Sequence, residues 1–472
     1  MAAHHQRLII CIALCIALAH AQLPLGHHQQ QHRLRSQTSC RIEQLRARRP
    51  TFSFQSEAGL TEYWDANAAE FQCAGAEFAR HLIHPKALLL PYYTNAPHLL
   101  YVVKGSSGIL GTAFPGCAET YEFEPDQDQQ RSKEGSKSFH DRHQKLRRFR
   151  RGDVLALQQG IAHWIYNDGD TPLVIVSLLD VANENNQLDF KFRKFFLAGN
   201  PQAVQTQGLR RREARESRKG GEEEEEKRNI FTGFDEELLA EIFNLEPEVI
   251  RKLQGNDDNR GTIVKAENLR LVFPEWGEEE QERRRDTNGL EETFCAAKLR
   301  QNIDHPSVAD VYNPRGGRIR SLNSHDLPIL SSLRLSAERG ILYKNALVSP
   351  HYTTNAHSVI YATRGGARIQ VVGNEGNPVF DGEVSEGELL IVPQNFVVIK
   401  KAGEEGFEYI AFKTNDNAMK SHLAGRLSAI RAMPEDVLVN SYGISKEQAK
   451  ELKYNREEAA VFSPGSVSGR HA

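Results

Sequence analysis

The pattern of apolar and polar positions predicts short β-strands along most of the chain. Apolar runs of three to seven residues are bounded by Gly, Asp or Asn, which is typical of strands in a buried sheet. Residues 367–371 instead alternate apolar and polar side chains, as expected for a strand with one solvent-facing side. The strands are predicted at 101–103, 154–157, 173–179, 359–361, 367–372, 388–392 and 408–412. These runs predict a mainly β protein.

The two halves of the chain repeat each other. The sequence YYTNA at 92–96, followed by YVVKG at 101–105, matches YTTNA at 352–356, followed by YATRG at 361–365. The apolar strands that follow the next glycine in each half correspond as well. Such internal similarity indicates a duplicated β module.

Each module is followed by a segment with helical spacing. Asp235 has the position of an N-cap, and the apolar residues from Leu238 to Phe243 recur at the spacing of one helix face. In the second half, Ser445 and Gln448 have the spacing of a capping box. We therefore expect two modules, each with a helical extension.

The N-terminal residues have the features of a secretory signal peptide. Arg7 ends a short n-region, residues 8–18 are apolar, and small residues precede a predicted cleavage between Ala21 and Gln22. The apolar run is too short to span a membrane, and a buried N-terminal helix is the less favoured alternative. We expect residues 22–39 to form a flexible N-terminus of the mature chain.

Three polar stretches interrupt the apolar pattern. Residues 205–228 contain the run Glu222–Glu226 and almost no apolar side chain, so we expect a disordered insertion. A polar insertion is also predicted at 127–151, and a variable linker at 256–288. The remaining segments are the first module (40–204), its helical extension (229–255), the second module with its helical tail (289–462) and a flexible C-terminus (463–472).

Composition narrows the class of protein. The 472 residues carry 59 Lys+Arg and 62 Asp+Glu, a formal net charge of −3. This net charge does not produce the positive electrostatic potential that attracts nucleic acids. The basic stretch 142–151 is the one nucleic-acid-like patch that we considered, and no nucleic-acid partner is expected. A mean hydropathy of −0.53 excludes a polytopic membrane protein.

Cysteine usage fits an oxidising compartment. Signal cleavage removes two of the six cysteines, and four remain: Cys40, Cys73, Cys117 and Cys295. None has the close spacing of a zinc site. Four cysteines allow three disulfide pairings, and their spacing alone does not show which of these pairings forms.

Several longer motifs resemble the legumin-type 11S seed storage globulins, which are double-cupin proteins. The most specific is NGLEETFC at 288–295, which looks like the processing junction of that family. CRIEQL, LDVANENNQLD, FLAGNP and RSLNSHDLPIL, which begin at residues 40, 179, 196 and 320, fit as well. The resemblance extends from about residue 40 to residue 462, and it implies two jelly-roll-like cupin barrels.

The resemblance also implies how such a chain matures. Cys40 would pair with Cys73, and Cys117 with Cys295. A vacuolar asparaginyl endopeptidase would cut between Asn288 and Gly289, and the disulfide to Cys295 would then join the two chains. Family members form trimers in the endoplasmic reticulum, become hexamers after the cut, and accumulate in protein storage vacuoles of seed; several are food allergens. The alternative is that Asn288-Gly289 is merely a turn.

The metal ligands of enzymatic cupins are incomplete in both modules. Those enzymes hold a metal with a His-x-His pair, a Glu and a third His. In the first module His163 lies at the third-His position and His98 at the Glu position, while Tyr92 and Thr94 replace the His pair. We therefore interpret His98 and His163 as vestigial positions of the motif.

The second module has even fewer candidates. Val398 lies at the third-His position and Ser358 at the Glu position. His351 and His357 flank this motif, but His351 has the wrong offset to share a strand face with His357. We expect no catalytic residue, metal or cofactor, and a nutrient-reservoir function. The alternatives are a metal-dependent oxidase of the germin kind and a small-ligand or sugar-binding cupin.

Overall fold

The computed structural model describes residues 40, 42–119, 121–122, 142–201, 229–267, 269–271 and 295–464. Several predicted features lie outside these residues: the signal peptide with its cleavage site between Ala21 and Gln22, the segment 22–39, the insertion 205–228, the junction Asn288–Gly289 and the C-terminal residues 465–472.

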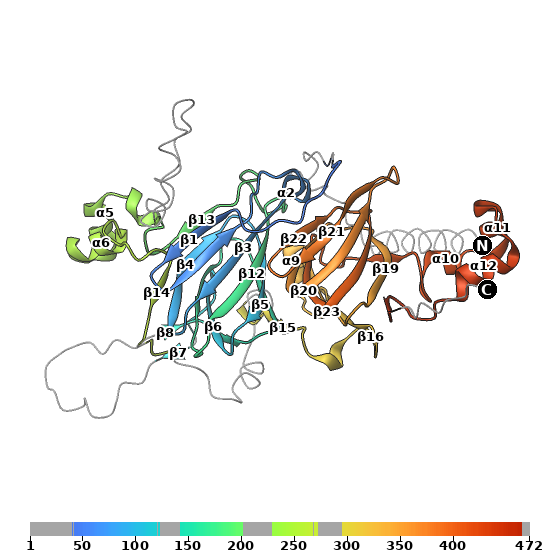
Figure 1. Ribbon diagram of the computed structural model, residues 1–472. Coiled ribbons are helices and arrows are strands. Elements are labelled where there is room, and N and C mark those ends of the chain that lie inside the picture. The colour runs from blue at the N-terminus through green and yellow to red at the C-terminus, as the bar shows by residue number, and fades with distance from the viewer. Residues whose placement is uncertain are drawn as a thin grey trace, which may run out of the picture.

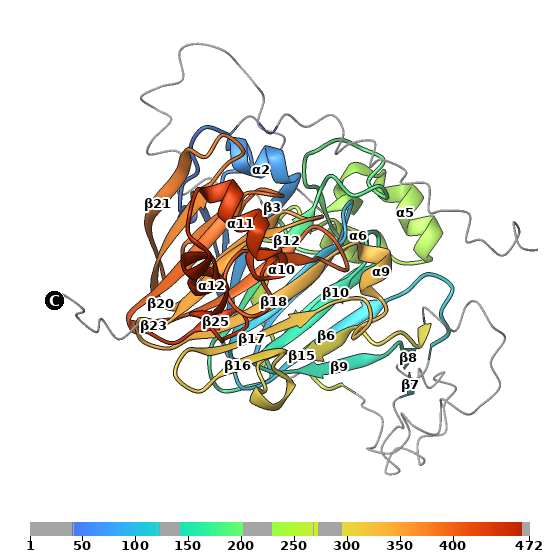
Figure 2. The ribbon, with the colours of Figure 1, turned by 90° about the vertical axis from the view of Figure 1, so that its right-hand side faces the viewer.

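Two β modules lie side by side, and helices project from opposite ends of the molecule (Figure 1). The first module is blue to green and the second is orange. Figure 2 views the molecule from the end that carries the last helices. The arrangement confirms the predicted fold class, which is mainly β with two cupin-like modules.

The first module consists of two antiparallel sheets packed face to face. The larger sheet has the order β1-β2-β3-β12-β5-β10-β15, and the smaller has the order β13-β4-β11-β6-β9 with β14 paired to β4. Apolar residues between the sheets form the barrel core, with Leu89, Leu100 and Ile165 among the least exposed. The strands are β1 (Phe52–Ser56), β2 (Gly59–Tyr63), β3 (Ala76–Ile83), β4 (Ala87–Thr94), β5 (His98–Lys104), β6 (Gly108–Ala113), β9 (Leu146–Phe149), β10 (Asp153–Leu157), β11 (Ala162–Tyr166), β12 (Leu173–Asp180), β13 (Lys194–Phe196), β14 (Ile263–Lys265) and β15 (Arg300–Asn302), beside a separate pair, β7 (Tyr121–Glu122) and β8 (Arg142–His143).

The second module forms one connected sheet of ten strands that curls into a barrel. Two long strands, β20 and β23, run through both of its faces. Gly365 makes the bend in β20 possible: its φ is +68°, and a Cβ there would lie 2.2 Å from the carbonyl oxygen of Gly406. The strands are β16 (Val311–Asn313), β17 (Gly317–Leu322), β18 (Ser336–Leu342), β19 (Leu347–Thr353), β20 (Ser358–Val372), β21 (Pro378–Ser385), β22 (Leu389–Val392), β23 (Val397–Lys413), β24 (Lys420–His422) and β25 (Val461–Phe462).

The helical extensions agree with the capping signals in the sequence. The Asp235 side chain accepts a hydrogen bond from the backbone N–H of Leu238, and Ser445 and Gln448 form a complete capping box. The first extension contains η3 (Ile230–Gly233), α5 (Glu236–Phe243) and α6 (Pro247–Gln254), and the second contains α10 (Ala429–Ala432), α11 (Glu435–Tyr442) and α12 (Lys446–Tyr454). The remaining short helices are α2 (Ala69–Ala74), η4 (Pro306–Val308) and α9 (Leu330–Leu333).

An apolar cluster joins the two modules. Phe78 and Tyr101 of the first module pack with Tyr361, Ile410 and Phe412 of the second. The Phe78 and Tyr361 rings stack with centroids 5.6 Å apart. Because these side chains have exposures of 3% or less, the two modules share one interior between them.

Each module also receives a short segment from the other part of the chain. β15 lies beyond residue 288 in sequence, yet it pairs with β10 of the first module. In the opposite direction, Arg48 forms a two-way backbone bridge with Leu389 of the second module, and the N–H of Leu45 donates to the carbonyl of Val379. The two parts of the chain are therefore interlocked by backbone hydrogen bonds.

Two predicted polar segments are shorter than expected. Within the predicted insertion 127–151, residues 146–149 form β9, which pairs with β6 and buries Leu146 and Phe149. Within the predicted linker 256–288, β14 pairs with β4 and buries Ile263. Phe149 and Ile263 belong to the barrel core and Leu146 to a smaller apolar cluster with Ile109 and Tyr166, although charged neighbours dominate the local composition.

Candidate functional sites in the two barrels

The motif residues of the first module converge inside its barrel. Tyr92 on β4 lies opposite His163 on β11, with ring centroids 4.3 Å apart, and the His98 ring on β5 lies 5.1 Å from that of His163. All three are no more than 2% exposed. The three motif positions therefore form one buried cluster inside the first barrel.

The two histidines of this cluster are uncharged. The Nδ1 of His163 lies 3.0 Å from the carbonyl oxygen of Ile161 and donates to it, and the Nδ1 of His98 lies 3.5 Å from Thr94 Oγ1. Burial lowers the pKa of His163 to about 4, and burial together with His163 and Lys194 holds the pKa of His98 well below its usual value. Neither Nε2 atom has a hydrogen-bond partner within the described parts of the chain.

Within this cluster, His98 and His163 each offer one imidazole nitrogen to a metal, while a third buried imidazole of the barrel, that of His81, has its Nδ1 3.0 Å from Thr61 Oγ1. Tyr92 supplies a phenol whose pKa is raised by burial, and the ammonium of Lys194 lies 4.8 Å from the Tyr92 ring. A nearby ammonium opposes the binding of a divalent cation. Of the described residues, no three of the His, Cys, Asp and Glu type come together here.

The second barrel has a different register from the one that the sequence repeat suggested. His351 on β19 lies opposite Val398 on β23, as Tyr92 lies opposite His163 in the first barrel. The sequence repeat matched Tyr92 with Tyr352, but the strand pairing matches Tyr92 with His351. The two matches differ by one residue because the loop after this strand is one residue longer in the second module. His351 therefore faces the barrel interior. His357 lies outside β19, and its Nδ1 accepts a hydrogen bond from the backbone N–H of Gln394.

A cluster of charged side chains, hereafter the lysine cluster, fills the site in the second barrel. Lys413 Nζ donates to Ser358 Oγ over 2.7 Å, so an ammonium lies beside the residue at the motif's Glu position. Lys420 Nζ and Tyr409 Oη donate to the two oxygens of Glu338, over 2.5 and 2.8 Å. Lys400 Nζ lies 4.3 Å from the centre of the Tyr409 ring. The lysine cluster comprises Glu338, Lys400, Tyr409, Lys413 and Lys420.

Burial controls the ionisation of the lysine cluster. It lowers the pKa of Lys400 to about 7 and that of Lys413 to about 8. Although burial alone would raise the pKa of Glu338, Lys420 and the other two lysines hold it well below its usual value. Ammonium groups thus occupy the region where an enzymatic cupin would hold its metal, and they repel cations.

The sequence analysis did not identify the lysine cluster. A signal was present, because Lys400 falls two residues after Val398 and two before Ala402, which is the spacing of side chains on one face of a strand. A lysine at an inward position of a strand is rare enough to indicate a special environment.

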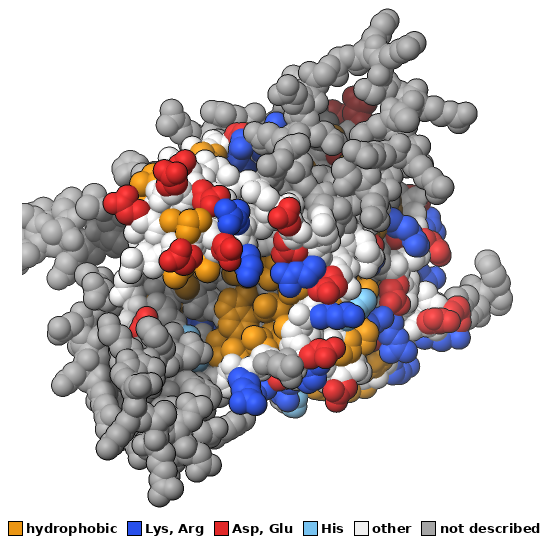
Figure 3. Space-filling model, turned by 90° about the vertical axis from the view of Figure 1, so that its left-hand side faces the viewer, with side chains coloured by type: hydrophobic (Ala, Val, Ile, Leu, Met, Phe, Trp, Pro, Cys, Tyr) orange, Lys and Arg blue, Asp and Glu red, His pale blue; other side chains and the backbone are white. Residues whose placement is uncertain are grey.

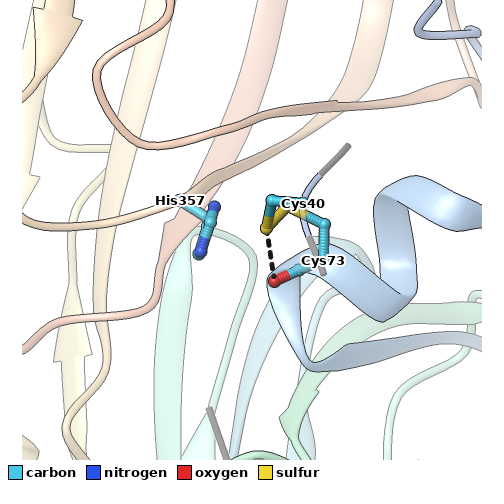
Figure 4. A group of neighbouring side chains, drawn as sticks. All are labelled: Cys40, Cys73 and His357. Carbon is cyan, nitrogen blue, oxygen red and sulfur yellow. Dashed lines mark hydrogen bonds between the residues drawn. A yellow bond between two sulfur atoms is a disulfide. The ribbon is translucent and has the colours of Figure 1, made fainter. Parts of the chain in front are cut away.

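One further group has the composition of a metal site. Figure 4 shows His357 beside Cys40 and Cys73, and their ligand atoms lie within 4.8 Å of one another. The two cysteines are joined in a disulfide, which has no thiolate to offer. The dashed contact in the figure, 3.4 Å from Cys40 Sγ to the Cys73 carbonyl, therefore carries no S–H donor.

The imidazole of this group is also engaged. The Nδ1 of His357 accepts a hydrogen bond from the backbone N–H of Gln394 over 3.2 Å. An accepting Nδ1 in a neutral imidazole places the proton on Nε2, which then cannot bind a metal. This arrangement is a disulfide packed against a histidine.

The second disulfide connects Cys117 of the first module to Cys295. Both pairings that the resemblance implies, Cys40–Cys73 and Cys117–Cys295, are thus present in the structure. The second bond closes a span of 178 residues that includes the junction at Asn288–Gly289.

Comparison with known proteins agrees with this architecture. The cupin family model matches residues 43–206 and 301–450. The 11S globulin subunit beta of Cucurbita maxima is 52% identical over 449 residues, covering 93% of this chain and 92% of the relative. Among solved structures, recombinant pro-11S globulin of pumpkin is 49% identical with a TM-score of 0.76, covering 91% of this chain and all of that one. The coconut allergen cocosin is 45% identical with a TM-score of 0.77, covering 90% of this chain and all of that one.

The two duplicated barrels define the class, which is that of the double-cupin proteins. With half of its residues identical to those of a curated relative over nearly the full length, the chain belongs to the 11S globulin family of seed storage proteins. None of the helices within the described residues is long and apolar enough to cross a membrane.

Proposed function

We propose that this chain is a nutrient reservoir that is cut after Asn288 into two disulfide-linked chains, stored in seed and hydrolysed at germination. The observation that carries the two-chain proposal is the Cys117–Cys295 bond, whose second cysteine follows Gly289 by six residues. A cut at the junction would leave this bond intact. The processing protease expected from the family is an asparaginyl endopeptidase.

The interlocked strands support the same proposal. After a cut at Asn288, the second chain would still supply β15 to the first module, and the first chain would still hold its bridge from Arg48 to Leu389. The apolar cluster between the modules would remain buried as well. The cut would therefore separate the chains covalently at one point without separating the folded modules.

Electrophoresis of the protein from seed tests the cleavage. Without reductant, we expect one band of the mature size, and with reductant, bands of about 30 and about 21 kDa, in proportion to the shares of the 53.2 kDa chain. A Cys117→Ser variant should show both bands without reductant, whereas Cys40→Ser should show one. A wild-type band that stays undivided after reduction would refute the proposal.

Exposed apolar side chains on the helical extensions support self-assembly. Leu238, Ile242 and Phe243 of α5 are 51%, 66% and 45% exposed. Figure 3 shows the end of the molecule that carries α5 and α6, where hydrophobic side chains gather in one area with acidic and basic side chains above it and to its right. At the other end, Val437 and Tyr442 of α11 are similarly exposed. We propose that each end docks on the opposite end of a second copy.

The helices at the two ends differ in charge. α5 contains three glutamates and no basic residue, while α12 contains three lysines and two glutamates. Unlike ends that meet repeatedly close into a ring. The family resemblance sets the expected size of the ring, a trimer that pairs into a hexamer after the cut.

Native mass spectrometry of the recombinant precursor tests the assembly. Wild-type protein should be trimeric, and Ile242→Asp should be monomeric because it places a carboxylate in the contact. Leu188→Asp is a matched control, since Leu188 is 54% exposed but lies outside the helical extensions. A trimeric Ile242→Asp variant would contradict the contact.

A secretory route to the protein storage vacuole follows from the proposed signal peptide. N-terminal sequencing of the seed protein should then begin at Gln22. A sequence that retains residues before Gln22 would contradict this cleavage site.

The rival enzymatic function has little support from the two barrels. A metal-dependent oxidase needs three or four ligands, and the described residues of the first site supply two imidazoles, while the second contains ammonium groups. We propose that the protein performs no metal-dependent catalysis and that His98 and His163 are vestigial. Elemental analysis should find manganese and iron far below one ion per chain, and a stoichiometric ion would reinstate the oxidase.

A further inference from the structure

The lysine cluster of the second barrel has more positive than negative groups. Lys400, Lys413 and Lys420 are opposed by one carboxylate, that of Glu338. Both oxygens of this carboxylate are already engaged, one by Lys420 and the other by Tyr409. Lys400 and Lys413 are 1% and 4% exposed, so water screens them poorly.

Most of the hydrogen-bond donors on these two lysines lack an acceptor. An ammonium group has three N–H donors. Lys413 donates to Ser358 Oγ, Lys400 Nζ lies over the Tyr409 ring, and no hydrogen bond of Lys400 is seen in the described portions of the chain. Nearby, His422 Nδ1 is also buried without a partner. Buried donors normally have a hydrogen-bond partner, which can be another protein group, a water molecule or a bound ligand.

We infer that the second barrel binds a compact anion, a halide or a short carboxylate, between the ammonium groups of Lys400 and Lys413. Such an anion would neutralise the excess charge and accept hydrogen bonds from both lysines, as charge-assisted bonds to buried cations require. This site goes beyond the proposed storage function and does not depend on it.

The anion is expected to bind more tightly in mild acid. Lys400 and Lys413, with pKa values of about 7 and about 8, are both charged at pH 5.5 and largely uncharged at pH 9.5. The other groups that act on the site change little over this range, because burial holds the pKa of His351 well below its usual value and that of His422 at about 4. The facing groups are Glu338 on β18, His351 on β19, Ser358 on β20, Tyr409 on β23, and Lys420 and His422 on β24.

The short strand β24 provides a route from solvent. It contributes Lys420, whose side chain is 17% exposed and reaches inward to Glu338. The residue before it, Met419, is 55% exposed. Lys420 thus connects the buried lysine cluster with the molecular surface.

The first barrel lacks this chemistry. Its cluster consists of imidazoles that burial keeps neutral, with Lys194 hydrogen-bonded to Tyr63 Oη over 2.9 Å. We expect no anion there. The two barrels of one molecule thus provide an internal comparison within a single crystal.

Bromide is a suitable probe because its anomalous scattering identifies it directly. Crystals of the full mature protein at pH 5.5, soaked in sodium bromide, should show an anomalous peak within hydrogen-bond distance of Lys400 Nζ and Lys413 Nζ. Calorimetric titration at constant ionic strength, with the bulky anion gluconate as background, measures the Kd for bromide and for acetate. The tighter ligand identifies whether the site prefers a halide or a carboxylate.

Variants separate this site from surface binding. Lys400→Met should weaken binding at least tenfold and remove the peak, and Lys413→Met should do the same. Lys401→Met, which changes the exposed neighbour on the same strand, should leave the Kd unchanged. Absence of the wild-type peak, or equal Kd values for wild type and Lys400→Met, would overturn the inference.

Discussion

The two barrels have matching strands but opposite interiors. In the first, His98 and His163 are neutral and lie beside an aromatic ring. In the second, Ser358 and Val398 occupy the same positions, and Lys413 fills the space beside them. The duplicated fold therefore preserves a place where side chains converge, whereas the chemistry of that place depends on which residues the strands carry.

The difference shows how each barrel tolerates polar groups in its interior. Neutral histidines require few partners and can be buried at modest free-energy cost, because burial simply removes their charge. The lysine cluster keeps charges and holds them through Glu338. The second barrel should consequently be the more sensitive of the two to a single substitution and to pH.

Removal of the carboxylate should have the largest effect. Glu338→Gln leaves the buried lysines without their counter-charge and should lower the free energy of unfolding by about 3 kcal/mol at pH 7. The equivalent position of the first barrel is Ala79, where no such charge exists. Urea denaturation measures the effect, and Glu383→Gln, at an exposed position of β21, is the matched control. Equal stability of the two variants would contradict the role of Glu338.

Removal of an excess lysine should have the opposite sign. Because the pKa of Lys400 is about 7 in the folded chain and 10.5 in the unfolded chain, the folded protein binds fewer protons between these values, and its stability rises with pH there. Below pH 7 the folded chain bears the full free-energy cost of burying the charged ammonium group of Lys400. Lys400→Met should therefore stabilise the protein by a few kcal/mol at pH 6 and by little at pH 10.5.

Urea titrations at both pH values test this sign. Lys401→Met, on the exposed side of the same strand, should leave the pH dependence unchanged. Destabilisation by Lys400→Met at pH 6 would contradict the prediction, because it would show that the interactions of the ammonium group stabilise the fold by more than its burial destabilises it.

The first barrel should respond in acid. The pKa of His163 is about 4 in the folded chain against 6.5 in the unfolded chain, so its contribution to stability falls as pH drops from 6.5 to 4. His163→Leu should remove about 2 kcal/mol of this acid-induced loss. Thermal midpoints of wild type and variant at pH 7 and pH 4.5 measure it, and parallel curves would contradict the assignment to His163.

The smallest changes in stability are expected at the helix caps, which both halves of the chain have. Asp235 and Ser445 both cap helices of the extensions, so Asp235→Ala and Ser445→Ala should each destabilise the local helix by about 1 kcal/mol. Hydrogen exchange of the amides in α5 and α12 measures the two changes. A clearly larger effect in one extension would show that tertiary contacts, rather than the cap, hold that helix.

Several features could be predicted because they depend on local sequence. The helix caps at Asp235 and Ser445 follow from hydrogen bonds within one turn. Strands such as β10 and β12 follow from apolar runs that fit a sheet. The predictions at 359–361 and 367–372 were less complete, since both belong to the single strand β20, which bends at Gly365. The short strands β9 and β14 were missed because charged neighbours obscure Leu146 and Ile263.

The sequence by itself determined the duplication, the class of fold, the caps and the motif residues His98 and His163, because each depends on the spacing of residues along the chain. Only the tertiary structure decided that His351 faces the barrel interior and that Lys400, Lys413 and Lys420 meet Glu338 there. These residues come from β18, β19, β23 and β24, and their meeting depends on the register in which these strands pair. A shift of one residue reverses the direction of a side chain, and spacing within a single strand does not specify which strand lies opposite.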